Sequence, residues 1–381
     1  MEHDVGLEAV VETARQHAAA VDAEARFPVE AVAALRETGL LGLTIPREHG
    51  GLGAGPVEFA DAVRDLAAAC GSTAMIYLMH VSAAMTVVAA PPPSQPDVLT
   101  RLADGRSLGT LAFSEPGSRS HFWAPVSQAK RSDDGADGAV RLSAAKSWVT
   151  SAGHADVYVV STLSADPGGA AEAGIDLYAV PAGADGVTVT GAFTGMGLRG
   201  NASAPMQFDT VVDDGMRLGA AGAGFELMTG TVMPWFNLGN AAVSHGLGAA
   251  AVQAAINHVS GARLQHAGQV LADLPTIRAR VAQMSLRQDA TGSYLRSAAA
   301  SIAAPDDSTP LYVLGVKALA NDSALAVTDD AMRVCGGAAF SHHLQVDRYF
   351  RDARAGHVMA PTADVLYDFY GKAVTGQPVF G

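Results

Sequence analysis

Apolar residues along the chain follow first a helical, then a strand-like, then again a helical pattern. Helical spacing runs through 5–23, 28–39 and 56–70, with Gly and Pro gathered between the runs. Short apolar or alternating runs then predict strands at 108–113, 157–162, 176–180, 187–189 and 206–212. Long Ala-rich stretches of helical period follow at 222–264, 272–301, 308–338 and 357–373.

This order of elements predicts an α+β fold with segregated layers, because a parallel α/β chain would alternate strands and helices. We expect an N-terminal α-helical domain at 1–108, a central and mostly antiparallel β domain at 109–213, and a C-terminal α-helical bundle at 214–381. The 381 residues, 49% of them hydrophobic, suffice to bury a large core.

Charge and targeting signals narrow the class of protein. The net charge of -13 disfavours nucleic acid and anionic membranes as partners, because no basic stripe is present to neutralise phosphates. The N-terminus lacks the pattern of a signal peptide, and the longest apolar candidate, 241–256, is broken by Ser244 and His245. We therefore expect no membrane span.

The two cysteines, Cys70 and Cys335, lie far apart and form no CxxC pair. This spacing indicates neither a disulfide framework nor a metal site. We expect a cytoplasmic enzyme with small-molecule partners and no bound metal.

Six segments, in matching order and spacing, resemble the acyl-CoA dehydrogenase family, whose superfamily includes flavin-dependent monooxygenases. They are 27–53, Ala112–Ser120, Lys146–Ala152, Gly197–Gly200, Val334–Phe340 and Arg351–Arg354. The resemblance covers almost the whole chain. It implies a helical lobe, a β domain and a C-terminal four-helix bundle, assembled as a homotetramer with FAD at a subunit interface.

The resemblance also implies which residues bind FAD. Trp148 and Thr150 would line the isoalloxazine ring, which needs an apolar platform with hydroxyl and backbone groups aimed at its heteroatoms. Arg263, from a neighbouring subunit, would pair with phosphate. The other expected contacts are Phe113, Ser114, Gly117, Ser120, Gly336, Gly337 and Thr362. Taken singly, a buried core Trp, surface serines and a helix-end Gly pair explain the same residues, and Arg333 stands where the family has Gln.

The glutamate that the family uses as catalytic base is missing. Removal of an α-proton from an acyl thioester calls for a desolvated carboxylate. Counting from Arg351-Asp352 places Ala360 at the usual base position, and Leu238 stands at the alternative position on the first long C-terminal helix. Phe236 replaces the aspartate that helps to hold the CoA arm.

Three residues are candidate replacements for the base: His357, one helical turn from Ala360, His80, and Asp364, which we expect to cap local backbone or face the adenine end. Each histidine has the alternative reading of a hydrogen-bonded core or surface side chain. On the substrate side we expect His121, Trp123, Trp235 and Phe236. The bulky run at 120–123 either narrows the acyl channel or is plain packing.

Three functions are compatible with these residues. The first is oxidation of an acyl thioester with a non-standard base and an electron-transfer flavoprotein as acceptor. The second is a flavin-dependent monooxygenase, supplied with reduced flavin by a separate reductase and using O2 on a small apolar substrate. The third is a non-catalytic FAD-binding subunit of a heterotetramer. Sites rather than folds decide between such functions.

Overall fold

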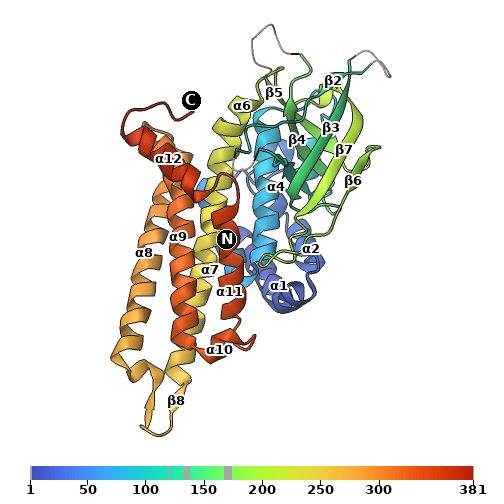
Figure 1. Cartoon of the computed structure of the whole chain (residues 1–381). Coiled ribbons are helices and arrows are strands. Elements are labelled where there is room, and N and C mark those ends of the chain that lie inside the picture. Colours follow the sequence, from blue (N-terminus) through green and yellow to red (C-terminus); the bar gives the residue numbers. More distant parts are fainter. Residues whose placement is uncertain (1, 119–120, 133–137, 167–173, 381) are drawn as a thin grey trace.

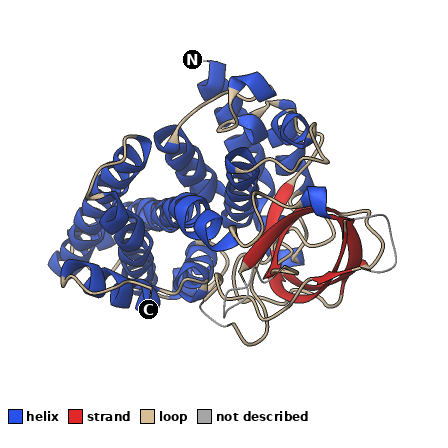
Figure 2. Ribbon diagram, turned by 90° about the horizontal axis from the view of Figure 1, so that it is seen from above, coloured by secondary structure: helices blue, strands red, loops and turns tan. Residues whose placement is uncertain are grey.

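The computed structural model describes all residues except 1, 119–120, 133–137, 167–173 and 381. Figure 1 shows a helical N-terminal region and a β domain side by side, next to a long bundle of C-terminal helices. Seen from above, the strands gather on one side of a largely helical molecule (Figure 2). The predicted α+β architecture is confirmed.

The N-terminal region contains five α-helices among its described residues. They are α1 (Glu2–Glu24), α2 (Val29–Glu37), α3 (Pro56–Ala69), α4 (Gly71–Ala89) and α5 (Val98–Ala103), and α3 packs against both α1 and α4. Helix α4 is buried on nearly every side against α3, α7 and β1, so its sequence shows little helical periodicity. It is long and apolar enough to cross a membrane by length and composition alone, but 83% of that window is buried inside the protein, as in a core helix.

The β domain contains two packed sheets. The three-stranded sheet has the order β1 (Gly109–Ala112), β4 (Val157–Leu163), β5 (Ile175–Pro181), and its β1–β4 pair is parallel. The other sheet has the order β2 (Lys130–Arg131), β3 (Ala139–Val149), β7 (Ala204–Asp213), β6 (Val187–Val189) and is antiparallel throughout. Buried side chains from both sheets, among them Tyr158 and Phe208, form the core between them.

The C-terminal region is built on three long helices. They are α7 (Met233–Gly261), α8 (Pro275–Ala303) and α9 (Thr309–Cys335), and α11 (Val346–Val358) packs against α7 and α9. The stretch expected to be one helix at 357–373 is instead the end of α11, a break, and α12 (Ala363–Val374). The shorter α6 (Gly224–Leu227) and α10 (Gly337–Phe340) flank the bundle.

His80 fixes α4 to its neighbours. Its side chain is fully buried, its Nδ1 accepts a hydrogen bond from the Gly109 amide at 3.0 Å, and its Nε2 lies 2.9 Å from the Leu41 carbonyl oxygen. Nε2 therefore carries the proton and the ring is neutral. Burial lowers the pKa of His80 to about 4.

This geometry predicts a loss of stability in mild acid. The unfolded chain binds a proton at His80 near pH 6.5, whereas the folded chain binds it only near pH 4, so stability is complete above pH 6.5 and falls between these values. The free energy of unfolding is measured in urea for the wild type and for His80→Gln. As the pH falls through this window, we expect the difference between the two values to shrink by about 1.4 kcal/mol per pH unit. Burial raises the pKa of Asp352 to about 6, which has the opposite effect on stability. Both proteins contain Asp352, so its effect cancels in the difference between them. A difference that is independent of pH would contradict the neutral, buried ring.

Candidate flavin and substrate site

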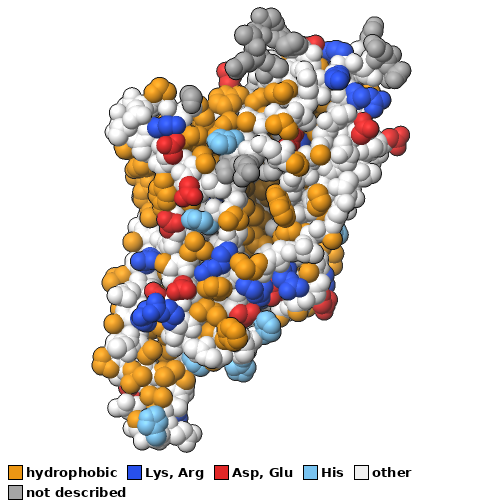
Figure 3. Space-filling model, in the orientation of Figure 1, with side chains coloured by type: hydrophobic (Ala, Val, Ile, Leu, Met, Phe, Trp, Pro, Cys, Tyr) orange, Lys and Arg blue, Asp and Glu red, His pale blue; other side chains and the backbone are white. Residues whose placement is uncertain are grey.

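A cavity of about 910 Å³ lies where the β domain meets α4, α7 and α11. Figure 3 shows hydrophobic side chains gathered around the hollow in this face of the molecule. Most of the wall is apolar, with methionines and aromatic rings from all three regions, as expected of a small-molecule site. These apolar side chains include Met75, Met79, Phe113, Phe122, Trp148, Phe193, Val232, Phe236 and Met359.

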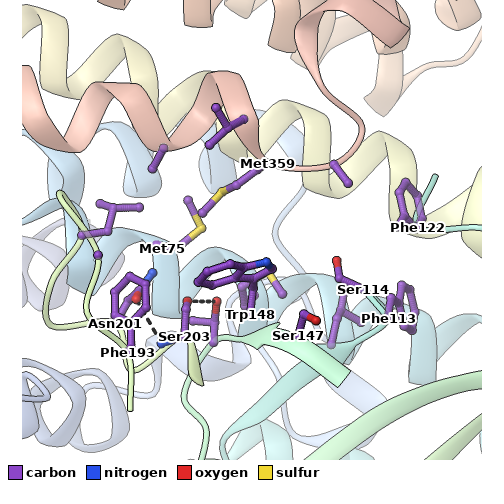
Figure 4. Close-up of a pocket in the computed structure, with 18 of the residues that line it drawn as sticks. Met75, Phe113, Ser114, Phe122, Ser147, Trp148, Phe193, Asn201, Ser203 and Met359 are labelled. Carbon is purple, nitrogen blue, oxygen red and sulfur yellow. Dashed lines mark hydrogen bonds between the residues drawn. The ribbon is translucent and has the colours of Figure 1, made fainter. Parts of the chain in front are cut away.

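Trp148 stands over the floor of the cavity (Figure 4). The β3–β7 pairing shifts register between Lys146 and Val149, and this bulge places Trp148 at a φ of 55°. A non-glycine residue in this region is strained, which is common where a side chain is aimed at a ligand. Trp148 is 68% exposed although buried residues such as Thr150 and Asn201 line the same cavity. It therefore offers an uncovered aromatic platform.

Hydroxyl and amide groups surround this platform. Thr150 Oγ1 lies 3.1 Å from Ser203 Oγ, and Ser114 and Ser147 lie on the floor beside the indole (Figure 4). Asn201 is 1% exposed, its Oδ1 accepts a hydrogen bond from the Ser203 amide, and its buried Nδ2 has no hydrogen-bond partner among the described residues. A buried donor without a partner costs free energy, and a ligand with an acceptor atom would satisfy it. The residues present thus fit an isoalloxazine ring.

Removal of the indole tests this platform. We expect Trp148→Ala to weaken FAD binding by roughly ten- to a hundredfold, because ring stacking contributes about 1–3 kcal/mol. The melting temperature of the FAD-free protein should change little, since the indole is already exposed. Equilibrium dialysis with FAD measures the affinity, and Trp148→Phe is the matched control that keeps an aromatic ring. Unchanged FAD affinity in Trp148→Ala would remove the indole from the flavin site.

The carboxylate of Glu115 reaches the edge of the cavity but is fully engaged. Its Oε1 is 2.5 Å from Lys146 Nζ, and its Oε2 accepts hydrogen bonds from the amides of Val126 (2.6 Å) and Ser127 (2.8 Å). Both side chains of the ion pair are buried. Burial alone would raise the pKa of Glu115, but Lys146 and these donors outweigh it and hold the pKa below its usual value. Glu115 is thus a structural anion and a poor base.

The wall carries no carboxylate at the expected base position. Ala360 lines the cavity, whereas Leu238 is fully buried in α7 and does not. The buried Lys317 donates hydrogen bonds to the carbonyls of Met359 (3.0 Å) and Pro361 (2.7 Å), on either side of Ala360. The backbone at position 360 is therefore firmly held although its side chain is a methyl group.

The three candidate bases do not come together in the cavity. His80 lies on α4, and its side chain is buried next to β1. Both of its ring nitrogens are hydrogen-bonded to backbone groups, so neither is free for proton transfer. His357 faces α9, where its Nδ1 lies 3.4 Å from Asp322 Oδ1. Asp364 is exposed and borders a separate outer pocket of about 400 Å³. Among the described residues of the cavity wall, no histidine is present.

The expected substrate residues are divided between several places. Phe236 lines the cavity as expected, but Trp235 packs into the core, with its ring centre 5.4 Å from that of Phe59. His121 and Trp123 border the outer pocket, and Phe122 between them faces the cavity. Asn201 and Ser203 are cavity residues that the sequence prediction missed, and Phe122 belongs to the bulky run that was expected either to narrow the channel or to be plain packing.

The expected cofactor residues fall into two groups. Phe113, Ser114, Gly117, Trp148 and Thr150 all line the cavity. Arg263 is exposed on the hairpin of β8 (Arg263–Leu264), at the opposite end of the molecule from β3 in Figure 1. Gly336 and Gly337 lie in the turn between α9 and α10, and Thr362 immediately precedes α12; none of these four residues lines the cavity. Ser120 lies outside the described residues.

Family models for the acyl-CoA dehydrogenase N-terminal, middle and C-terminal domains match residues 7–106, 110–211 and 222–375. The chain belongs to the acyl-CoA dehydrogenase family. It is therefore a member of a family of flavoprotein oxidoreductases, and that prediction is confirmed.

Relatives and solved structures agree with this membership. The cyclohex-1-ene-1-carbonyl-CoA dehydrogenase of Geobacter metallireducens is 27% identical over 357 residues, which cover 93% of this chain and 92% of that protein. The butyryl-CoA dehydrogenase structure from Megasphaera elsdenii superposes with a TM-score of 0.88 at 22% identity, covering 97% of this chain and 98% of that one. An FAD complex of PigA superposes with a TM-score of 0.88 at 17% identity, covering 98% and 96%. The last two likenesses show the acyl-CoA dehydrogenase fold.

Proposed function

We propose that this chain is an FAD-dependent oxidoreductase that holds a small apolar substrate beside the flavin and uses no side-chain base on the substrate carbon. One observation carries the proposal. In the described part of the cavity wall the one carboxylate, Glu115, is bound by Lys146 and two backbone amides, and position 360 is alanine.

FAD is the cofactor that suits this cavity. Trp148 would stack on the isoalloxazine ring and Asn201 Nδ2 would donate to one of its heteroatoms. Bound FAD would supply two-electron chemistry, as a hydride acceptor or, once reduced, as the electron donor to O2. Arg263, Gly336 and Gly337 do not line the cavity of their own chain, so we assign them to the adenine end of FAD on a second copy within a homotetramer.

Of the reactions open to the family, a flavin-dependent monooxygenation fits this wall best. The overall reaction takes one apolar substrate, O2, two electrons and two protons, and yields the hydroxylated substrate and water. A separate flavin reductase would supply the electrons. No step requires a carboxylate poised over the substrate α-carbon, and the many methionine and aromatic side chains suit an apolar substrate.

Acyl-thioester desaturation is the second candidate. It is favoured by relatives that match over most of their length and are named acyl-CoA dehydrogenases. That reaction would need a route for the α-proton that the described wall does not offer, and an electron-transfer flavoprotein as acceptor.

Labelled oxygen distinguishes these functions. The FAD-loaded chain is reduced anaerobically with dithionite and mixed with 18O2 and a panel of small apolar compounds. The proposal predicts incorporation of one 18O atom into a product. Oxidised flavin that is bleached by an acyl-CoA thioester would establish the dehydrogenase instead. Activity that arises only on mixing with a carboxylate-bearing partner chain would identify a non-catalytic subunit.

A further inference from the structure

The segment at 121–123 separates the cavity from the outer pocket. Phe122 lines the cavity, whereas His121 and Trp123 line the outer pocket of about 400 Å³, which lies against α12 and α6. The rings of Phe122 and Trp123 meet edge to face with centres 5.1 Å apart. The partition between the two spaces is therefore one pair of aromatic side chains thick.

The C-terminal segment covers this partition from outside. Phe380 packs edge to face on Trp123, Phe225 and Phe369, with ring centres 5.6, 5.4 and 5.1 Å apart. These three rings come from the loop after β1, from α6 and from α12. Trp123 is only 8% exposed, whereas Phe380 is 40% exposed. Phe380 thus forms the outermost layer of an aromatic stack that reaches the cavity.

The segment that carries Phe380 is held by that ring and by the neighbouring Val379, which packs against the core. Helix α12 ends at Val374, Gly376 has a φ of 72°, and the Gln377 amide donates to the Lys372 carbonyl at 2.8 Å, which turns the chain back. Residues 375–378 are exposed. The segment 375–380 is therefore a strap whose far end is fixed by Phe380 and Val379.

The stack continues inward to the flavin side of the cavity. Phe122 lies parallel to Phe113, with ring centres 6.0 Å apart and an interplanar angle of 10°. Phe113 and Phe122 both line the cavity. A change at Phe380 would therefore reach the cavity wall through Trp123 and Phe122.

We propose that Phe122, Trp123 and Phe380 form a partition that determines how long a substrate the cavity accepts, with Phe380 as a positioning residue. When the partition is opened, the outer pocket becomes a continuation of the cavity. Its rim carries Asp364 and the Asp368–Lys372 pair, with Asp368 Oδ2 and Lys372 Nζ 2.9 Å apart, so a neutral alkyl chain suits it better than an anionic one. The inference rests on the proposed function only in that the cavity holds an apolar substrate.

Binding of primary n-alkyl alcohols of increasing length tests the partition without turnover. Each methylene that enters an apolar space should tighten binding about fourfold. In calorimetry on the FAD-loaded wild type, the gain in affinity per methylene should stop at the alcohol chain length that fills the cavity. In Trp123→Ala and Phe380→Ala it should continue to longer alcohols. Val374→Ala, an exposed apolar site on α12, is the matched control and should behave as wild type.

A common stopping length in all four proteins would overturn the partition. The strap has its own test in a Trp148→Phe, Trp235→Phe background, where Trp123 is the only tryptophan. Phe380→Ala should raise the acrylamide quenching constant of Trp123 severalfold, and Phe380→Leu should raise it less. An unchanged quenching constant would show that Phe380 does not cover Trp123 and would overturn the role of segment 375–380 as a strap. Both readouts are independent of O2 chemistry, so failure of the proposed monooxygenation leaves them interpretable.

Discussion

Replacing Ala360 with glutamate is expected to make this chain oxidise an acyl-CoA thioester much faster than the wild type does. Ala360 lines the cavity, and Lys317 holds the carbonyls on both sides of it, so a new side chain would project from a fixed backbone. A positioned general base contributes on the order of 10²–10⁴ in rate. Anaerobic bleaching of the flavin by butyryl-CoA should accelerate by that factor.

Ala360→Gln is the control for this gain. It adds a side chain of nearly the same size that cannot accept the proton, so it should bleach no faster than wild type. If butyryl-CoA bleaches the flavin of Ala360→Glu no faster than that of Ala360→Gln, position 360 does not face the reacting carbon. This result would contradict our placement of the missing base.

Removal of the ammonium group at Lys146 is expected to destabilise the fold strongly. Lys146 Nζ lies 2.5 Å from Glu115 Oε1 and donates to the Ser161 carbonyl at 2.6 Å, and both side chains of the pair are buried. Breaking a buried ion pair from one side costs about 3–5 kcal/mol, because the remaining charge stays buried without a partner. Lys146→Met should lose that much free energy of unfolding in urea. It should also bind FAD less tightly, since Glu115 borders the cavity.

Two further variants bracket this effect. Arg131→Met breaks the partly exposed pairs of Arg131 with Asp166 and Asp214 and should cost about 0–1 kcal/mol. Lys146→Met combined with Glu115→Gln should recover part of the loss, because it removes the unpaired charge. A cost for Lys146→Met that is as small as that for Arg131→Met would show that the buried pair contributes little.

The sequence predicted the three regions and one wall of the site, because periodicity and matched motifs carry that information locally. It did not predict β3 as a strand, since the Ala and Ser residues of 139–149 soften the contrast between its buried and exposed positions. The extent of α4 was also missed, because a helix that is buried all round shows no apolar face.

Side-chain direction was the larger gap. The Ala124 amide donates to the His121 carbonyl and closes a turn, which sends Phe122 to the cavity and its two neighbours to the outer pocket. His80 was a candidate base until its two backbone partners, far away in the sequence, were known. The unpartnered Nδ2 of Asn201 likewise depends on how the loop before β7 packs. No single-sequence pattern encodes these contacts.

We propose that the cavity holds a flavin and that its described wall offers no side-chain base to the substrate carbon. The visible spectrum of the FAD-loaded wild-type chain, recorded anaerobically before and after mixing with a series of acyl-CoA thioesters, tests this proposal most directly. We expect the oxidised flavin spectrum to persist with every thioester, while dithionite bleaches it at once. Rapid bleaching by any one thioester would contradict this expectation and show that a proton acceptor lies beside the substrate.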